Sequence, residues 1–249
     1  YAVWLTLQNR KARGNDRYSI SKRPATVEWS SQNMLVLGIV ILAFLVVHMI
    51  QFWAKMQLQE IRGAEGMLPP SMGTLFIQEA FACVWTPIVY IIGFIALWFH
   101  MNHGFWSMFQ SIGWNNITWL PRLKTIACWW TSIVVLLFIA QAIVFTVNAN
   151  NDFYKKDATL REQYKKVVGD VVGIPVDRFK YDELSDMLRQ RQQQMEALLN
   201  EPSQMMQMGA TPEMVQNEIA AMAPAMEFLN YLEGVNVEEV AVEEVQPEN

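Results

Sequence analysis

The three histidines are the residues of this sequence best suited to chemistry, because all of them lie in or beside long apolar segments. His48 is the only ionisable residue between positions 34 and 53, and His100 and His103 close the segment 79–103. Ionisable side chains within membrane-length segments are rare and mark ligand, ion or proton sites. An imidazole there could ligate a metal, or it could hydrogen-bond to a neighbouring helix.

Small residues surround His100 at helical spacing. Gly93, Ala96, His100, Gly104 and Ser107 fall on one face of a predicted helix. Glycines at 93 and 104 lack the Cβ atoms that would keep a flat, wide ligand such as a porphyrin away from the helix backbone. Close helix–helix packing is the alternative explanation, but it gives no reason for an ionisable ring at this position.

The composition divides the chain into two unlike parts near residue 150. Residues 1–150 contain ten Lys and Arg against five Asp and Glu, for a net charge of +5. Residues 151–249 contain nine against nineteen, for a net charge of −10. We therefore predict an all-α protein with a transmembrane helix bundle over 1–150, followed by an acidic, soluble tail over 151–249 that is helical or partly disordered.

Three complete membrane spans are predicted, over 34–53, 79–103 and 125–147, each close to the ~20 residues that a bilayer core requires. Residues 54–78 are expected to form a short connection with a turn at Pro69-Pro70. Residues 1–7 are similar to the last turns of a preceding span, so we expect an amino-terminally truncated membrane protein. Basic residues concentrate in 10–23 and at 122–124, which predicts that these connections face the cytoplasm and that the tail lies outside.

Breakers divide the tail into three predicted helices, over 157–168, 181–200 and 211–232, and the last residues, 238–249, are expected to fray. It contains no glycine-rich phosphate loop and no catalytic constellation. Its few basic residues give no support to nucleic-acid binding, so we predict no nucleic-acid partner.

The predicted depths of His48 and His100 differ. His48 lies about 22 Å up from the cytoplasmic edge of the first span, at about 1.5 Å per residue. His100 lies about 30 Å down from the outer edge of the second span, close to the cytoplasmic face. Two imidazoles separated by ~20 Å in depth cannot share one iron, so if both are ligands they serve two stacked haems.

Residues 1–150 resemble the five-helix dihaem cytochrome b subunit of succinate dehydrogenase and fumarate reductase. The resemblance lies in His100-Met-Asn-His-Gly104-Phe-Trp with the following residues to 114, in Val47-His48-Met-Ile-Gln-Phe-Trp53, and in the basic entry at 8–13. It implies that His48 ligates the distal haem b and His100 the proximal one. The second axial histidines would lie on helices upstream of Tyr1.

The resemblance also implies a function and partners. The chain would anchor a flavoprotein subunit and an iron–sulfur subunit to the inner membrane of a bacterium, in contact with lipid. Electrons would pass through two haems to or from a membrane quinone, with menaquinone favoured. His103 would be a propionate contact or an interfacial ring, and Lys55 either meets a propionate or extends to the lipid headgroups. The alternative from another class is a haem-free anchor or transporter segment whose histidines hydrogen-bond between helices.

Overall fold

The computed structural model describes residues 1–14, 28–62, 68–114, 116–173 and 175–234, and all regular elements in these ranges are helical. The first half contains α1 (Ala2–Arg13), α2 (Trp29–His48), the π-helix η1 (Met49–Ala54), α3 (Lys55–Arg62), α4 (Gly73–Ala82), α5 (Trp85–Met108) and α6 (Trp119–Asn150). The second half contains α7 (Phe153–Lys156), α8 (Ala158–Val172), the 3-10 helix η2 (Val176–Arg178), α9 (Tyr181–Asn200), α10 (Pro202–Gln207) and α11 (Pro212–Glu233). The predicted all-α fold class is confirmed.

The chain forms two compact units. Residues 1–51 and 83–146 make the first, which we call the membrane unit. Residues 52–82 and 147–249 make the second, which we call the tail unit. The sequence-based boundary near 150 separates the same two parts, but it leaves residues 52–82 with the membrane helices, whereas the structure groups them with the tail.

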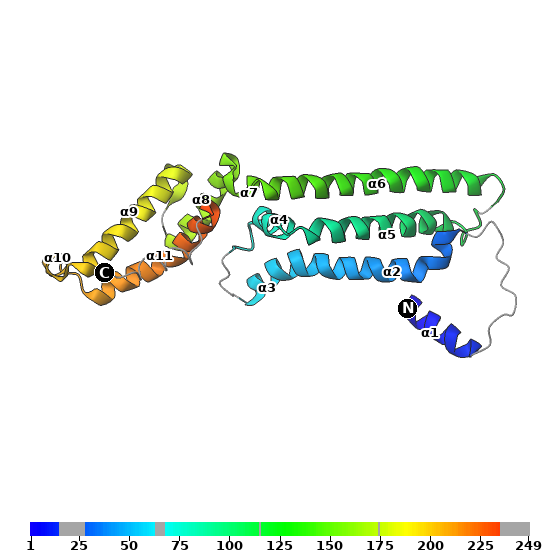
Figure 1. Ribbon diagram of the computed structural model, residues 1–249, viewed down its shortest axis with the longest axis horizontal. Coiled ribbons are helices and arrows are strands. Elements are labelled where there is room, and N and C mark those ends of the chain that lie inside the picture. Colours follow the sequence, from blue (N-terminus) through cyan, green and yellow to red (C-terminus); the bar gives the residue numbers. More distant parts are fainter. Residues whose placement is uncertain (15–27, 63–67, 115, 174, 235–249) are drawn as a thin grey trace, which may run out of the picture. The chain divides into compact units, whose positions relative to one another are not determined.

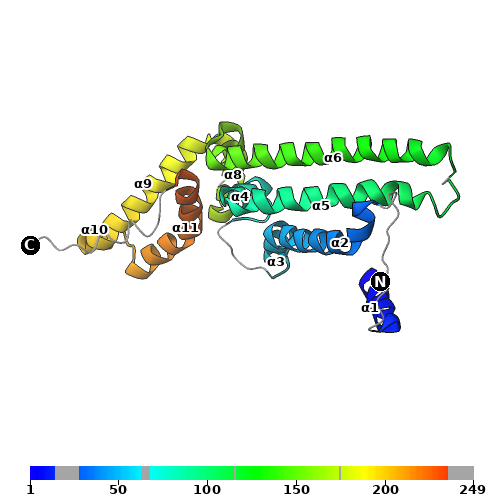
Figure 2. The ribbon, with the colours of Figure 1, turned by 45° about the vertical axis from the view of Figure 1, so that its right-hand side comes forward.

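Three helices in the described ranges are long and apolar enough to cross a membrane, as predicted. They extend over Trp29–Ile61, Trp85–Met108 and Trp119–Asn150. Figures 1 and 2 show α2, α5 and α6 lying side by side. Of the 20 residues of α2, Leu37 is the buried one, so the helix exposes apolar side chains almost all round, as a lipid-facing helix does. The chain is a multi-pass membrane protein.

The second span differs from its prediction because the chain breaks at Cys83 and Val84, between α4 and α5. Pro87 explains the break. In a continuous helix its ring would clash with the carbonyl of Cys83, four residues earlier. In the structure Pro87 is the third residue of α5, where a backbone N–H has no partner within the helix in any case. The span predicted over 79–103 therefore begins later, at Trp85, and extends to Met108.

Aromatic rings pack the helices of the membrane unit. A Cβ on Gly93 would lie 2.6 Å from the Phe44 ring, so the glycine lets α2 approach α5 closely. Phe44 also meets Tyr90 and Phe94 edge-on, with ring centroids 5.1 and 5.4 Å apart. The Phe94 ring also stacks on Phe138 of α6 at 5.5 Å.

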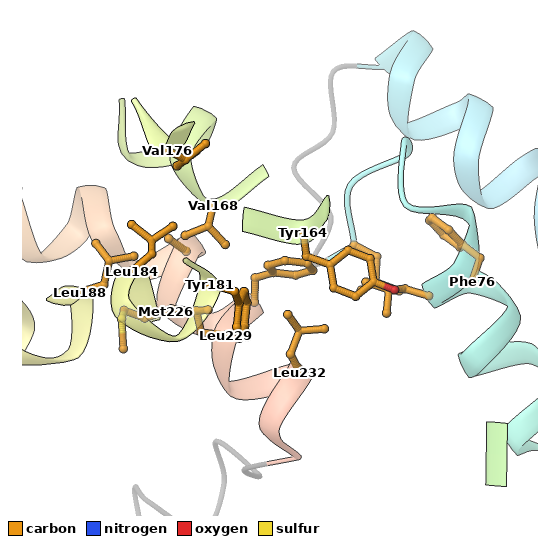
Figure 3. Packing of buried hydrophobic residues seen from close by; sticks show 14 residues of the cluster. Phe76, Tyr164, Val168, Val176, Tyr181, Leu184, Leu188, Met226, Leu229 and Leu232 are labelled. Atoms are coloured by element: carbon orange, nitrogen blue, oxygen red, sulfur yellow. The ribbon is translucent and has the colours of Figure 1, made fainter. Parts of the chain in front are cut away.

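The tail unit has an ordinary hydrophobic core, shown in Figure 3. Helices α8, α9 and α11 match the three predicted tail helices closely, and their ends have the expected caps. Asp157 and Thr211 accept hydrogen bonds from backbone N–H groups of the first turns, and Gly173 and Gly234 end α8 and α11 in the left-handed conformation. Residues 238–249, predicted to fray, lie outside the described residues.

The segment before α5 contributes to this core, which the sequence analysis did not predict. Leu68, Leu75 and Phe76 are buried against Tyr164 and its neighbours from the tail. The Tyr164 hydroxyl donates to the Tyr154 carbonyl at 2.7 Å and lies 3.0 Å from the Thr74 hydroxyl.

Candidate functional site

His48 is the last residue of α2, and its exposed ring is tied to α5. Its Nδ1 atom lies 3.0 Å from the hydroxyl of Tyr90. The helix does not end here, because η1 continues it as a π-helical turn from Met49 to Ala54. Single π turns inside α-helices are rare and frequently occur at functional sites.

A directed series of hydrogen bonds extends from His48 along α5. The Tyr90 hydroxyl donates to Gln51 Oε1 at 3.1 Å, and Gln51 Nε2 donates to Thr86 Oγ1 at 3.1 Å. Since the Tyr90 proton is used on Gln51, the hydroxyl oxygen accepts from His48 Nδ1–H. The lone pair of the His48 ring is then on Nε2, which is the atom that a histidine offers to a metal in this tautomer.

His100 lies half-buried on α5 and faces α2. Its Cε1 atom is 3.9 Å from the position that a Cβ of Gly38 would occupy, so the imidazole lies directly opposite this glycine at van der Waals distance. Its Nδ1 atom is buried and has no hydrogen-bond partner among the described residues. An unsatisfied buried polar nitrogen costs about 1–3 kcal/mol, so its place in the helix interface calls for an explanation.

The two imidazoles occupy opposite ends of the α2–α5 interface. His100 is level with Gly38, and Gly38 precedes His48 by ten residues of α2, which corresponds to about 15 Å along the helix. Ligand nitrogens bind iron at about 2 Å, so these two rings cannot serve one metal ion. The two rings thus lie at different heights, at a separation somewhat shorter than the predicted ~20 Å.

His103 does not join His100. Its Nδ1 atom lies 3.3 Å from Glu28 Oε2, and Lys124 Nζ donates to the other Glu28 oxygen at 2.6 Å. Lys124 also lies over the Trp106 ring, 4.4 Å from its centroid. Burial by itself would raise the pKa of Glu28, but the hydrogen bonds from Lys124 and His103 outweigh it and hold this pKa below its usual value. The carboxylate therefore links α5 and α6 to the start of α2.

The other predicted contact residues lie apart from one another. Gly93 accommodates the Phe44 ring, as described above, whereas a Cβ on Gly104 would meet nothing within 4 Å. Gly104 thus has the open space that a large ligand needs, and Gly93 serves helix packing in this structure. Lys55 forms an exposed ion pair with Glu79 at 3.4 Å within the tail unit.

An apolar groove of about 290 Å³ lies between α2 and α5. It is lined by Ile39, Val40, Ala43, Phe44, Val47, Val89, Ile92 and Gly93. A second hollow of about 250 Å³ adjoins the Glu28 cluster and is largely aromatic. The first groove has hydrocarbon walls, although neither His48 nor His100 is among its lining residues, and such walls suit an apolar molecule.

Sequence reasoning missed the partners of the histidines. Tyr90, Gln51, Thr86 and Glu28 were not among the predicted site residues, although a signal existed. Gln51 and Thr86 are polar residues in apolar segments, and such residues in membrane helices usually pair with one another. No protein family, curated protein or solved structure matches this chain in our comparisons.

Proposed function

We propose that this chain is the membrane-anchor and electron-transfer subunit of a succinate:quinone or quinol:fumarate oxidoreductase, with His48 and His100 as axial ligands of two b-type haems. One observation is central to the proposal. The imidazoles of His48 and His100 lie about 15 Å apart along one helix pair. His48 carries its lone pair on Nε2, and the buried Nδ1 of His100 has no hydrogen-bond partner among the described residues.

The residues fit the proposed cofactor in three ways. The Tyr90 contact on His48 is the type of outer hydrogen bond that metal-ligating histidines usually make. Gly104 leaves space on α5, because a Cβ there would meet nothing within 4 Å. The groove between α2 and α5 is apolar, and a porphyrin is bound largely by such surfaces. When bound, haem would supply one-electron redox chemistry, and the protein supplies its orientation and environment.

The sequence has three histidines, and two haems with two histidine ligands each would need four. If His103 is committed to Glu28, as in the structure, this sequence supplies His48 and His100 as one axial ligand to each haem. The ring of His48 and much of the apolar surface of α2 are exposed.

The proposed partners follow from the distribution of charge. A flavoprotein subunit and an iron–sulfur subunit would dock on the cytoplasmic side, which is the side that the sequence predicts for the basic connections at 10–23 and 122–124. The tail unit would then lie on the outer side of the inner membrane. The electron partner within the bilayer would be a quinone, with menaquinone favoured.

A haem-free anchor or transporter segment is the second candidate, and the His48–Tyr90 contact favours it. That hydrogen bond joins α2 to α5 without any cofactor, and hydrogen bonds between membrane helices are worth about 0.6 kcal/mol on average. It leaves the buried Nδ1 of His100 without a role, which is why we prefer the haem proposal.

Optical spectra of the intact subunit, purified in its native complex, test the proposal. We expect a reduced-minus-oxidised spectrum of low-spin haem b and two haems per subunit by pyridine haemochromogen assay. His48→Ala and His100→Ala should each remove one haem, while His103→Ala, the matched control, keeps both. A complex without haem would establish the haem-free anchor, and loss of haem in His103→Ala together with its retention in His100→Ala would exchange their roles.

A further inference from the structure

We propose that Tyr90 is a positioning residue for His48, and that Gln51 and Thr86 set the direction of its hydrogen bond. The network would hold the imidazole in the Nδ1-protonated tautomer with Nε2 as the ligating atom. The redox readouts of this proposal rest on the proposed haem function, but the tautomer itself can be measured without haem.

The direction follows from what each group can do. The Gln51 amide nitrogen only donates and its oxygen only accepts, and the nitrogen is directed to Thr86 Oγ1. The oxygen therefore faces Tyr90 and takes the phenol proton at 3.1 Å. A phenol that donates to Gln51 has only lone pairs left for His48, so the hydrogen bond to the imidazole requires a proton on Nδ1.

The Tyr90 side chain has little freedom to break this arrangement. It is 5% exposed, and Phe44 and Phe94 pack edge-on against it, with centroids at 5.1 and 6.0 Å and interplanar angles of 88°. The ring cannot move away without displacing both neighbours. His48, in contrast, is exposed at the end of α2, so the hydroxyl of Tyr90 gives orientation to a ring that its own helix does not enclose.

The π-helical turn provides the third member of the network. Gln51 lies in η1 directly after His48, where the wider turn alters the direction in which side chains leave the helix. Thr86 is the second residue of α5, so the amide of Gln51 links this turn to the start of α5. Four polar groups inside apolar helices are thereby paired, which is the condition for keeping them in a membrane.

Substitution of Tyr90 by Phe tests the proposal, because it removes the hydroxyl and keeps the ring that Phe44 and Phe94 contact. We expect Tyr90→Phe to retain both haems but to lose one of them about 10- to 100-fold faster to a haem scavenger, in line with other outer hydrogen bonds of metal ligands. The midpoint potential and low-temperature EPR signal of that haem should shift, while those of the other haem stay unchanged. Gln51→Leu should have a similar effect, and Thr86→Val a smaller one.

Tyr231→Phe is the matched control, since it removes a hydroxyl in the tail unit that has no hydrogen-bond partner in the described structure. It should leave both haems as in the wild type. If Tyr90→Phe is equally silent in a protein whose His48→Ala variant has lost one haem, the positioning role is refuted while the haem function stands.

Nitrogen NMR of labelled histidine in the haem-free protein separates the two proposals further. We expect His48 to be protonated on Nδ1 in the wild type and to populate both tautomers in Tyr90→Phe. Protonation of wild-type His48 mainly on Nε2 would overturn the inference. A native complex that contains no haem would instead overturn the proposed function, and the tautomer measurement would still decide the role of Tyr90.

Discussion

Leucine lies in the interior of the tail unit but on the surface of the membrane unit. In the tail unit Leu184, Leu188, Leu229 and Leu232 are almost completely buried. In the membrane unit Leu42 is 60% and Leu136 64% exposed. Water drives leucine into the tail core, whereas hydrocarbon around a membrane helix removes that driving force. The many exposed apolar residues of α2 and α6 thus fit helices that face lipid.

Polar groups show the reverse arrangement. In the membrane unit they pair with one another between helices, as in the His48–Tyr90 contact and the bond from Trp98 Nε1 to Ser132 Oγ at 2.9 Å. In the tail unit the ion pairs of Arg189 with Glu233 and of Arg191 with Glu218 are near the surface. A polar group facing lipid finds no partner, so the membrane unit turns such groups inward.

Leucine truncation should show the largest difference between the units. Leu229→Ala opens a cavity in the tail core and is expected to reduce the free energy of unfolding of that unit by about 2–5 kcal/mol. Leu136→Ala, the matched change on the exposed face of α6, should change stability by at most about 0.5 kcal/mol. Hydrogen exchange of each unit in detergent solution measures both, and equal losses would contradict the inside–outside comparison.

The second-largest effect is expected at alkaline pH, which should lower the stability of the tail unit. Burial raises the pKa of Tyr181 to about 12, and its hydroxyl has no partner in the described ranges. Because the unfolded chain ionises near pH 10, stability from Tyr181 is fully present below pH 10 and is lost as the pH rises through about 12. The loss should reach about 2–3 kcal/mol, since each pKa unit corresponds to about 1.4 kcal/mol.

Tyr181→Phe should remove much of this alkaline loss and leave stability at neutral pH unchanged or slightly higher. Hydrogen exchange of tail-unit peptides between pH 10 and 12, corrected for the intrinsic exchange rate, is the measurement. An unchanged alkaline transition in Tyr181→Phe would exclude this tyrosine as its source.

Acid should have the smallest effect, and it should act on the membrane unit. The pKa of Glu28 is held below 4.5 by Lys124 and His103 against the effect of burial. Its contribution is therefore present above pH 4.5 and is lost as the pH falls through the lowered pKa. The site is partly exposed, so we expect at most about 1 kcal/mol.

Glu28→Gln should flatten this dependence of stability on acid pH. Thermal unfolding in detergent measures it by tryptophan fluorescence, since Trp29 and Trp106 line the adjoining hollow. Glu213→Gln, on the exposed first turn of α11, is the control and should leave the profile unchanged. If the stability of Glu28→Gln varied with pH as in the wild type, the Glu28 carboxylate would not be what links α2 to α5 and α6.

Most helices could be predicted because their signals are local. The apolar segments at 34–53 and 125–147 are long enough to identify spans. Asp157 and Thr211 begin α8 and α11, and Gly173 ends α8, as residues of these types often do. The break before α5 was predictable in principle, since Pro87 cannot continue a helix from Cys83. The packing of residues 68–76 into the tail core was not predictable, because Thr74 in this segment meets Tyr164, which is 90 residues later in the chain.

The sequence by itself determined that three segments cross a membrane, that an acidic helical part follows them, and that His48 and His100 lie at different depths. These properties depend on hydrophobic length and on a rise per residue that every helix shares. Only the tertiary structure decided which groups meet. Tyr90 is 42 residues from His48 and Glu28 is 75 from His103, and such pairs form because α2, α5 and α6 pack in one particular register. That register depends on side-chain shape, such as the fit of Phe44 against Gly93, which no local pattern encodes.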